Sequence, residues 1–168
     1  MVKDFKDRKQ AMNYWLLKTE PDVFSWDDLR DSPDRTTQWE GVRNYQARNF
    51  LKEMKAGDLG FFYHSVVKPQ AIHGIVKIVR PAYPDPTQFD PDSEYFDPQS
   101  ARDNPRWFLV DVQYQREIKP AITREELKSV PELKKMVLLN NTRLSVQPVT
   151  PEEWKIILHL RSIPEKFD

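Results

Sequence analysis

The sequence predicts an α+β fold, in which short helices surround a small, mixed and curled sheet or barrel. The 168 residues are typical of one domain. About five or six short segments have the composition of strands, and they do not alternate regularly with long helices. This order argues against a doubly wound parallel sheet. We expect residues 14–168 to form one domain and residues 1–13, which are polar and highly charged, to form a flexible tail.

The first half of the chain contains clear start signals for helices. A short buried strand at residues 14–18 is stopped by Pro21. Ser25 and Asp28 have the spacing of a capping box, which begins a short helix. Asn44 is a good N-cap for a second helix, because its side-chain oxygen can accept from the free N–H groups of the first turn. The apolar stripe of that helix follows at helical spacing, and Gly57 is placed to end it: Ala47, Phe50, Leu51 and Met54.

The second half reads as strands that surround a long loop. Strands are expected at residues 59–65, 71–80 and 107–118, with a short one at 143–146. Residues 81–105 carry six of the fourteen prolines, and their aromatic side chains indicate a loop that packs on the body. Further helix starts are predicted at two capping boxes: Thr123 with Glu126, and Thr150 with Pro151 and Glu153.

Composition excludes several classes of protein. Hydrophobic residues make up 39% of the chain, charged residues 31%, and there is no cysteine. Disulfides and thiolate metal sites are therefore excluded, which fits an intracellular protein, cytoplasmic or, in a eukaryote, nuclear. No apolar run approaches the roughly 20 residues that cross a bilayer, so we expect no membrane partner. A monomer is assumed, since the sequence does not address the oligomeric state.

The sequence lacks the usual signs of an enzyme. The three histidines, His64, His73 and His159, are far apart and have no metal-ligand spacing. There is no phosphate-binding glycine-rich loop, no dinucleotide fingerprint and no serine nucleophile elbow. We therefore expect no metal, no cofactor and no catalytic residue.

Charge is balanced overall but unevenly distributed. The formal net charge is zero. Residues 41–80 hold seven basic and two acidic side chains, whereas residues 81–105 hold one basic and six acidic side chains. A neutral protein is not a strongly electrostatic binder of nucleic acid, but such a distribution can polarise a surface.

Residues 39–49 are the most informative segment. Trp39 and Gly41 precede the helix that Asn44 caps, so the loop is fixed beside the positive end of a helix dipole. An aromatic face, Arg43 and an amide at this place suit a flat polar or anionic ligand, such as a nucleobase with its phosphates. A well-capped helix with Trp39 packed on the core explains the same residues without any ligand.

Two further segments offer polar side chains near strand ends. Tyr63, His64 and Ser65 supply donors and acceptors for the edge of a ligand. His64 and Ser65 also suggest nucleophilic catalysis, but neighbours on a strand point to opposite faces. Arg143 and Ser145 share a face, and two interpretations stay open: they complete a polar pocket, or Arg143 pairs with the acidic loop.

Together these segments resemble the EVE domain family, and within it the thymocyte nuclear protein group. The likeness covers residues 14–160. One departure is Thr19, where the family usually has serine, and the hydroxyl is kept. The shared motifs, in chain order, are Tyr14-Trp15-Leu16, Lys18-Thr19-Glu20-Pro21, Trp39 to Phe50, Phe61 to Ser65, Ala82-Tyr83-Pro84-Asp85, Asp103-Asn104-Pro105 with Trp107, Val110-Asp111-Val112, Met136-Val137-Leu138, and Arg143-Leu144-Ser145 with Gln147-Pro148.

The resemblance implies a fold and a function. Its fold is similar to that of PUA-like and YTH domains, a small distorted β-barrel with peripheral short helices. It implies a non-catalytic module that binds nucleic acid carrying a modified base, with modified cytosine in DNA favoured over RNA. The alternatives are an RNA-binding PUA-like or YTH-like module for modified or structured RNA, and a small hydrolase that uses His64 and Ser65.

The expected site residues follow from the resemblance together with the segments above. Lys18, Thr19 and Trp39 correspond by position to the YTH pattern, and the remaining base-binding set comes from the family motifs and their surroundings: Glu20, Arg43, Asn44, Tyr63, His64 and Ser65. Arg48, Arg143 and Ser145 are expected to contact phosphates or to take a secondary role. Lys18 and Arg43 are also expected to contact phosphates.

Overall fold

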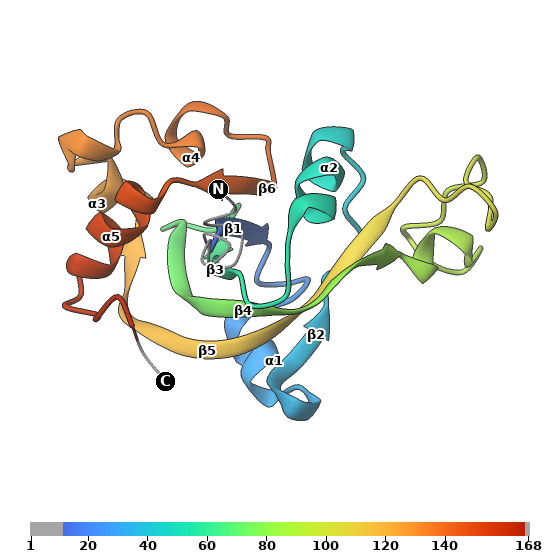
Figure 1. The fold of residues 1–168 in the computed structure, drawn as a ribbon, viewed down its shortest axis with the longest axis horizontal. Helices are drawn as coiled ribbons and strands as arrows, with labels where there is room; N and C mark the ends of the chain where they lie inside the picture. The colour runs from blue at the N-terminus through green and yellow to red at the C-terminus, as the bar shows by residue number, and fades with distance from the viewer. Residues whose placement is uncertain (1–11, 167–168) are drawn as a thin grey trace, which may run out of the picture.

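A six-stranded, strongly curled sheet forms the centre of the protein, with helices on both of its faces (Figure 1). The computed structural model describes residues 12–166. Nearly all of the predicted tail, residues 1–11, lies outside this range. The strands are β1 (Tyr14–Thr19), β2 (Thr36–Gln38), β3 (Leu59–His64), β4 (Ala71–Pro84), β5 (Phe108–Thr123) and β6 (Val146–Val149). The helices are α1 (Trp26–Asp31), α2 (Tyr45–Glu53), α3 (Arg124–Lys128), α4 (Val137–Asn140) and α5 (Pro151–His159), with short 3-10 turns at Pro33–Arg35, Pro86–Phe89 and Pro131–Leu133.

The sheet is mixed, as the sequence predicts. Its strand order is β2-β5-β4-β3-β1-β6. β1 and β3 are parallel, and the other neighbours are antiparallel. Within residues 12–166 the edge strands β2 and β6 do not pair with each other, so the sheet is curled but not closed. The predicted α+β class is confirmed, and the barrel is an open one.

Alternation along the central strands produces a hydrophobic core on each face of the sheet. Trp15 and Leu17 of β1 pack in one core with residues of α1 and α2, whereas Leu16 packs in the other with residues of α3, α4 and α5. Phe62 and Phe61 of β3 divide in the same way. Because successive side chains of a strand point to opposite faces, two short apolar strands serve both cores.

The predicted helix starts are present. The side chain of each N-cap accepts a hydrogen bond from the backbone N–H three residues on: Ser25, Asn44, Thr123 and Thr150. The capping boxes at Ser25 and Thr150 are complete. The box predicted at Thr123 is half formed, because the carboxylate of Glu126 accepts instead from the guanidinium of Arg161.

Several predicted boundaries are wrong. β4 continues to Pro84, which pairs with Phe108, so the pairing of β4 with β5 is longer than expected. The register shifts in this stretch accommodate the prolines. The strand predicted at 143–146 begins only at Val146. α2 ends at Glu53, and Gly57, with φ of 97°, lies in the following turn.

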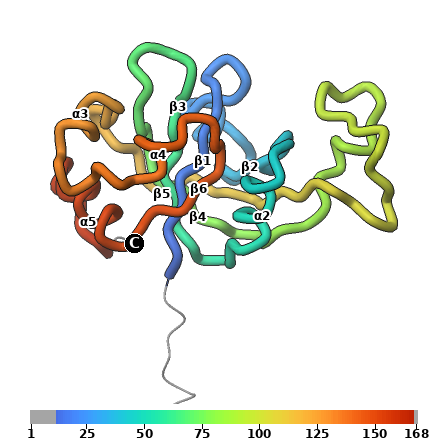
Figure 2. Tube along the Cα trace, turned by 90° about the horizontal axis from the view of Figure 1, so that it is seen from above, coloured from blue at the N-terminus to red at the C-terminus, as the bar shows by residue number. Residues whose placement is uncertain are grey.

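The proline-rich loop forms a projecting arm, defined here as residues 85–107 (Figures 1 and 2). Its centre is Gln88, which is fully buried. The Gln88 amide donates to the carbonyls of Asp85 and Trp107, and its oxygen accepts from Ser100 and from the Trp107 backbone. The arm is therefore folded on itself. It contacts the body at its base, through Asp85 with Gly41 and Arg43, and extends away from it beyond that point.

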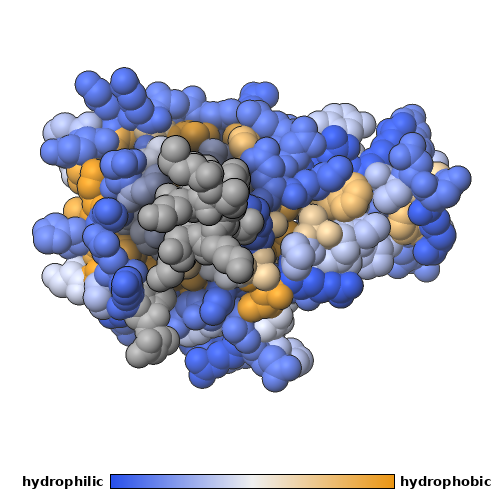
Figure 3. All heavy atoms as spheres, in the orientation of Figure 1, coloured by the Kyte–Doolittle hydropathy of each residue, from blue (hydrophilic) through white to orange (hydrophobic). Residues whose placement is uncertain are grey.

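The face in Figure 3 is mostly hydrophilic, and hydrophobic side chains appear on it in separate patches. In the described part of the chain, none of the helices has the length and apolar character needed to cross a bilayer.

Candidate functional site

A cleft opens where the parallel strands β1 and β3 end. Thr19 and His64 are partners at this end, and the backbone N–H of Ser65 donates to the carbonyl of Thr19 at 3.0 Å. The carboxyl ends of neighbouring parallel strands are a common place for a ligand. The cleft has two chambers, which share Lys18, Thr19, Glu20 and Ser145.

One chamber, which we call the aromatic chamber, has a volume of about 340 Å³. Trp39 is 7% exposed and lies edge-on against Phe62, with the ring centres 5.5 Å apart. Its backbone N–H donates to the carbonyl of Val110 at 2.8 Å. Trp39 is thus held in place by the core and by β5. The lining residues outside the shared set are Val23, Phe24, Thr37, Gln38, Trp39, Glu40, Gly41, Val42, Arg43 and Tyr95.

The base of the arm supplies one wall of this chamber. The Asp85 carboxylate is fully buried, and it accepts from the Arg43 guanidinium at 3.0 Å and from the backbone N–H of Gly41 at 2.8 Å. The same guanidinium donates to the carbonyl of Tyr95 at 2.8 Å and to the Thr87 hydroxyl at 3.0 Å. Arg43 therefore lines the chamber in a fixed position and connects the body to the arm.

Gly41 allows the Tyr95 ring to close this wall. Its φ is +85°, and a Cβ at this position would lie 2.6–2.8 Å from carbons of the Tyr95 ring. A side chain is therefore excluded both by the backbone conformation and by the packing. Glu40, beside it, has its pKa raised by burial and by the nearby Asp85 carboxylate.

The other chamber, which we call the basic chamber, has a volume of about 510 Å³. Lys18 donates through Nζ to the carbonyl of Thr142 at 3.1 Å. Burial and the nearby Arg124 guanidinium lower the pKa of Lys18. The lining residues outside the shared set are Ser65, Val66, Gln70, Arg124, Leu138, Thr142 and Arg143. Three cations and one carboxylate thus line this chamber.

The structure brings most of the expected site residues to the cleft. Both chambers contain Lys18, Thr19, Glu20 and Ser145, while Trp39 and Arg43 line the aromatic chamber and Ser65 and Arg143 line the basic chamber. The Thr19 hydroxyl donates to the carbonyl of Phe24 at 3.0 Å, which holds the loop after β1. Within residues 12–166 Arg143 makes no ion pair, so the alternative in which it pairs with the acidic loop is wrong.

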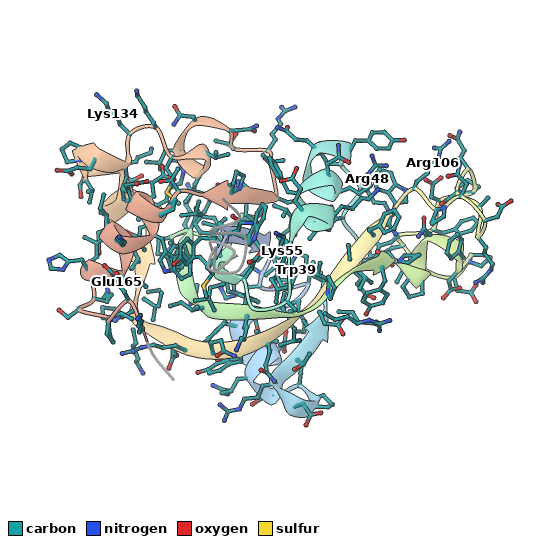
Figure 4. All side chains as sticks on the ribbon, in the orientation of Figure 1. Trp39, Arg48, Lys55, Arg106, Lys134 and Glu165 are labelled. Carbon is teal, nitrogen blue, oxygen red and sulfur yellow. The ribbon has the colours of Figure 1, made fainter. Side chains whose placement is uncertain are left out.

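Four of the expected residues line neither chamber: Asn44, Arg48, Tyr63 and His64. Asn44 caps α2 by accepting from the N–H of Ala47 at 2.9 Å. Arg48 lies over the Tyr45 ring and donates to the carbonyl of Arg106 in the arm at 3.0 Å (Figure 4). Asn44 therefore stabilises the start of α2, and Arg48 connects α2 to the arm.

Tyr63 and His64 lie beneath the cleft and not in it. Tyr63 is fully buried, and its hydroxyl donates to Gln70 Oε1 at 2.8 Å, so it contacts the basic chamber only through Gln70. Burial raises the pKa of Tyr63 to about 12. His64, on the opposite face, accepts the N–H of Trp26 through Nε2 at 3.1 Å. Burial, and then the neighbouring His73, lowers the pKa of His64 to about 4.

This geometry argues against His64 as the catalytic base that the hydrolase alternative requires. A neutral imidazole has one acceptor nitrogen, and in His64 that nitrogen is already bonded to Trp26. The Ser65 hydroxyl lines the basic chamber. Among residues 12–166 no group of three or more acidic or histidine side chains is arranged to hold a metal ion.

Several lining residues were missed from the sequence, among them Gln38, Glu40, Tyr95 and Arg124. Glu40 directly follows Trp39, and this adjacency is a usable signal. Tyr95 stood out only as an aromatic residue in a loop. Arg124 follows the Thr123 cap and carries no sequence signal, since β5 alone brings it to the strand ends.

Comparisons with known proteins agree with this architecture. Residues 13–160 match the EVE domain. Human thymocyte nuclear protein 1 is 47% identical over 90% of this chain and 75% of its own length. The structure of human THYN1 protein in complex with DNA containing 5-methylcytosine superposes with a TM-score of 0.86, at 47% identity, covering 93% of this chain and 99% of that one.

A more distant likeness supports the fold. The YTH domain of the Zygosaccharomyces rouxii MRB1 protein, solved with N6-methyladenosine RNA, has a TM-score of 0.52 at 14% identity, covering 95% of this chain and 90% of that one. The predicted relation to PUA-like and YTH domains is therefore confirmed at the level of fold. Given the match over residues 13–160 and the 47% identity to its human relative, the chain belongs to the EVE domain family.

Proposed function

We propose that this protein is a non-catalytic module that binds nucleic acid through a modified base, with modified cytosine in DNA as the favoured ligand. One observation carries the proposal. Trp39 lines a chamber of about 340 Å³ in a chain 47% identical to a protein solved with 5-methylcytosine DNA. That volume lies within the range of about 300–1,000 Å³ that is usual for ligand pockets.

The aromatic chamber has the chemistry to hold a cytosine. Extruding a base from a duplex costs a few kcal/mol, and stacking on an aromatic side chain such as Trp39 returns ~1–3 kcal/mol. Carboxylates pair with the exocyclic amine of cytosine, and Glu20 and Glu40 are the two in the lining. Phe24, on the same wall as Thr19, offers an apolar surface for a methyl group.

The test is a titration of matched oligonucleotides that contain cytosine or 5-methylcytosine, as DNA and as RNA. Wild type is compared with Trp39→Phe, Trp39→Ala and Glu40→Gln, and circular dichroism checks that each variant is folded. We expect tighter binding to methylated DNA, and Trp39→Ala to weaken it about 5- to 100-fold.

A matched control is Phe96→Ala, which removes a 39% exposed aromatic side chain from the arm outside the chamber. It should leave methylated-DNA binding unchanged. If wild type binds all four oligonucleotides equally, and no folded variant alters this, the proposal is wrong. Preference for the RNA forms would favour the RNA-binding alternative.

The name of the human relative also supports a nuclear location in a eukaryotic host, which imaging of a tagged chain tests.

A further inference from the structure

The basic chamber carries charge that the proposed base contacts do not use. Lys18, Arg124 and Arg143 line it together with a single carboxylate, that of Glu20. The aromatic chamber, in contrast, contains as many carboxylates as cations, because Glu20 and Glu40 balance Lys18 and Arg43. The positive charge of the cleft is thus concentrated in one chamber.

The two arginines of this chamber differ from the paired arginines Arg43 and Arg161. Arg43 pairs with Asp85, and Arg161 forms a two-pronged pair with Glu126. Within residues 12–166, neither Arg124 nor Arg143 forms an ion pair. Arg124 is half-buried and close enough to Lys18 for the two charges to repel. An anion between Lys18 and Arg124 would offset this repulsion and accept hydrogen bonds from the ammonium and the guanidinium group.

The chamber also has neutral hydrogen-bonding groups and a suitable position. The Ser65 and Thr142 side chains and the Gln70 amide lie in its lining. Lys18, Thr19, Glu20 and Ser145 form the ridge that separates it from the aromatic chamber. A base and its phosphate are joined through one sugar, and the two chambers are adjacent because they share these four lining residues.

We infer that the basic chamber binds the backbone phosphate next to the base held in the aromatic chamber, through Arg124, Arg143 and Lys18. This inference rests on the proposed function. It divides the work of the cleft, because base contacts determine which nucleotide is selected and phosphate contacts hold the strand in register.

The first experiment measures affinity for cytosine and 5-methylcytosine DNA between 50 and 200 mM salt, with Arg124→Gln, Arg143→Gln and the double variant. Each substitution should weaken binding to both DNAs by a similar factor, about tenfold. The ratio of the two affinities should therefore stay unchanged. The slope of log K against log salt should fall in magnitude by about 0.7–0.9 for each phosphate that the protein no longer neutralises. Lys155→Gln, an exposed charge on α5, is the control and should change neither quantity.

A second experiment locates the phosphate. A neutral methylphosphonate replaces the linkage on the 5′ or the 3′ side of the modified base, and the titration is repeated. In wild type, one of the two replacements should lower the affinity about tenfold. In the double variant, the same replacement should cause no further loss of affinity. An oligonucleotide with and without a terminal phosphate separates a strand-end phosphate from an internal one.

Three outcomes would overturn the inference. The arginine variants could behave like Lys155→Gln, the methylphosphonate penalties could persist in the double variant, or affinity could depend only on a terminal phosphate. Failure of the proposed function would look different: wild type would not distinguish methylated from unmethylated DNA, although the salt slope would still respond to the arginines.

Discussion

The two chambers of the cleft meet at one ridge but use arginine in opposite ways. In the aromatic chamber, Arg43 is bonded to Asp85, Thr87 and Tyr95, and all of its strong contacts are to the protein itself. In the basic chamber, Arg124 and Arg143 form no ion pair within residues 12–166. An arginine paired with a carboxylate has a structural role, whereas an arginine without such a partner is available to an anionic ligand.

Two neighbouring side chains of β3 that line neither chamber also differ. Tyr63 donates to Gln70, which lines the basic chamber, whereas His64 accepts from the backbone of Trp26 in α1. Tyr63 has a pKa of about 12, so it does not titrate in the physiological range. His64, with a pKa of about 4, is neutral near pH 7 and becomes charged only in acid. Of the two, only His64 changes its charge in acid.

The largest effect that we expect comes from breaking the wall with Asp85→Ala. The substitution leaves the Arg43 guanidinium and the Gly41 N–H without their buried acceptor. It should lower the free energy of unfolding by about 3 kcal/mol, since an uncompensated buried charge remains. Urea denaturation measures this loss. Asp92→Ala, which removes an exposed carboxylate from the same arm, is the control. Equal stability of the two variants would show that the Arg43–Asp85 pair does not anchor the arm.

A smaller effect is expected from pH. Because the pKa of His64 is about 4 in the folded protein and near its ordinary value of 6.5 in the unfolded chain, the unfolded chain binds more protons between these values. Stability should therefore fall as the pH drops from about 6.5 to about 4. The loss is about 2 kcal/mol, allowing for partial access of solvent.

Urea denaturation at both ends of this window tests the pH effect. His64→Gln keeps an acceptor for the Trp26 N–H but cannot be protonated, so it should flatten the pH dependence. His73, whose pKa is also lowered by burial, lies against His64 with the ring centres 4.0 Å apart, and it contributes in the same direction. The exposed His159→Gln is the control. A His64→Gln protein that loses as much stability as wild type would exclude this histidine as the cause.

The smallest expected effect separates wall packing from backbone strain. Gly41 and Gly57 both have positive φ, but a Cβ would strike Tyr95 at Gly41 and meet nothing within 4 Å at Gly57. Backbone strain should cost each alanine variant about 1 kcal/mol of stability, and the contact with Tyr95 should add to this cost only at Gly41. Gly41→Ala alone should weaken methylated-DNA binding, by about tenfold, with the salt slope unchanged. If both variants bind equally well, the Tyr95 wall does not contribute to the site.

Much of the local structure was predictable because its causes are local. The N-caps at Ser25, Asn44 and Thr150 depend on side chains that reach three residues along the chain. The strands β1 and β3 were predicted correctly from short apolar and aromatic runs, which need no distant partner to be recognised. Where pairing set the limits, as in the long β4–β5 ladder, the predicted ends were wrong.

By itself the sequence determined the mixed α+β class, the helix starts and the family, and it directed attention to Trp39. Only the tertiary structure decided what each polar side chain does. Arg43 and Arg143 look alike in the sequence, yet one has Asp85 beside it and the other has no paired carboxylate within residues 12–166. The physical reason is that a charged side chain is paired or unpaired according to its neighbours in space. Asp85, the partner of Arg43, lies 42 residues away along the chain. Folding, by bringing the ends of β1 and β3 beside Arg124 and the arm, set the two chambers apart.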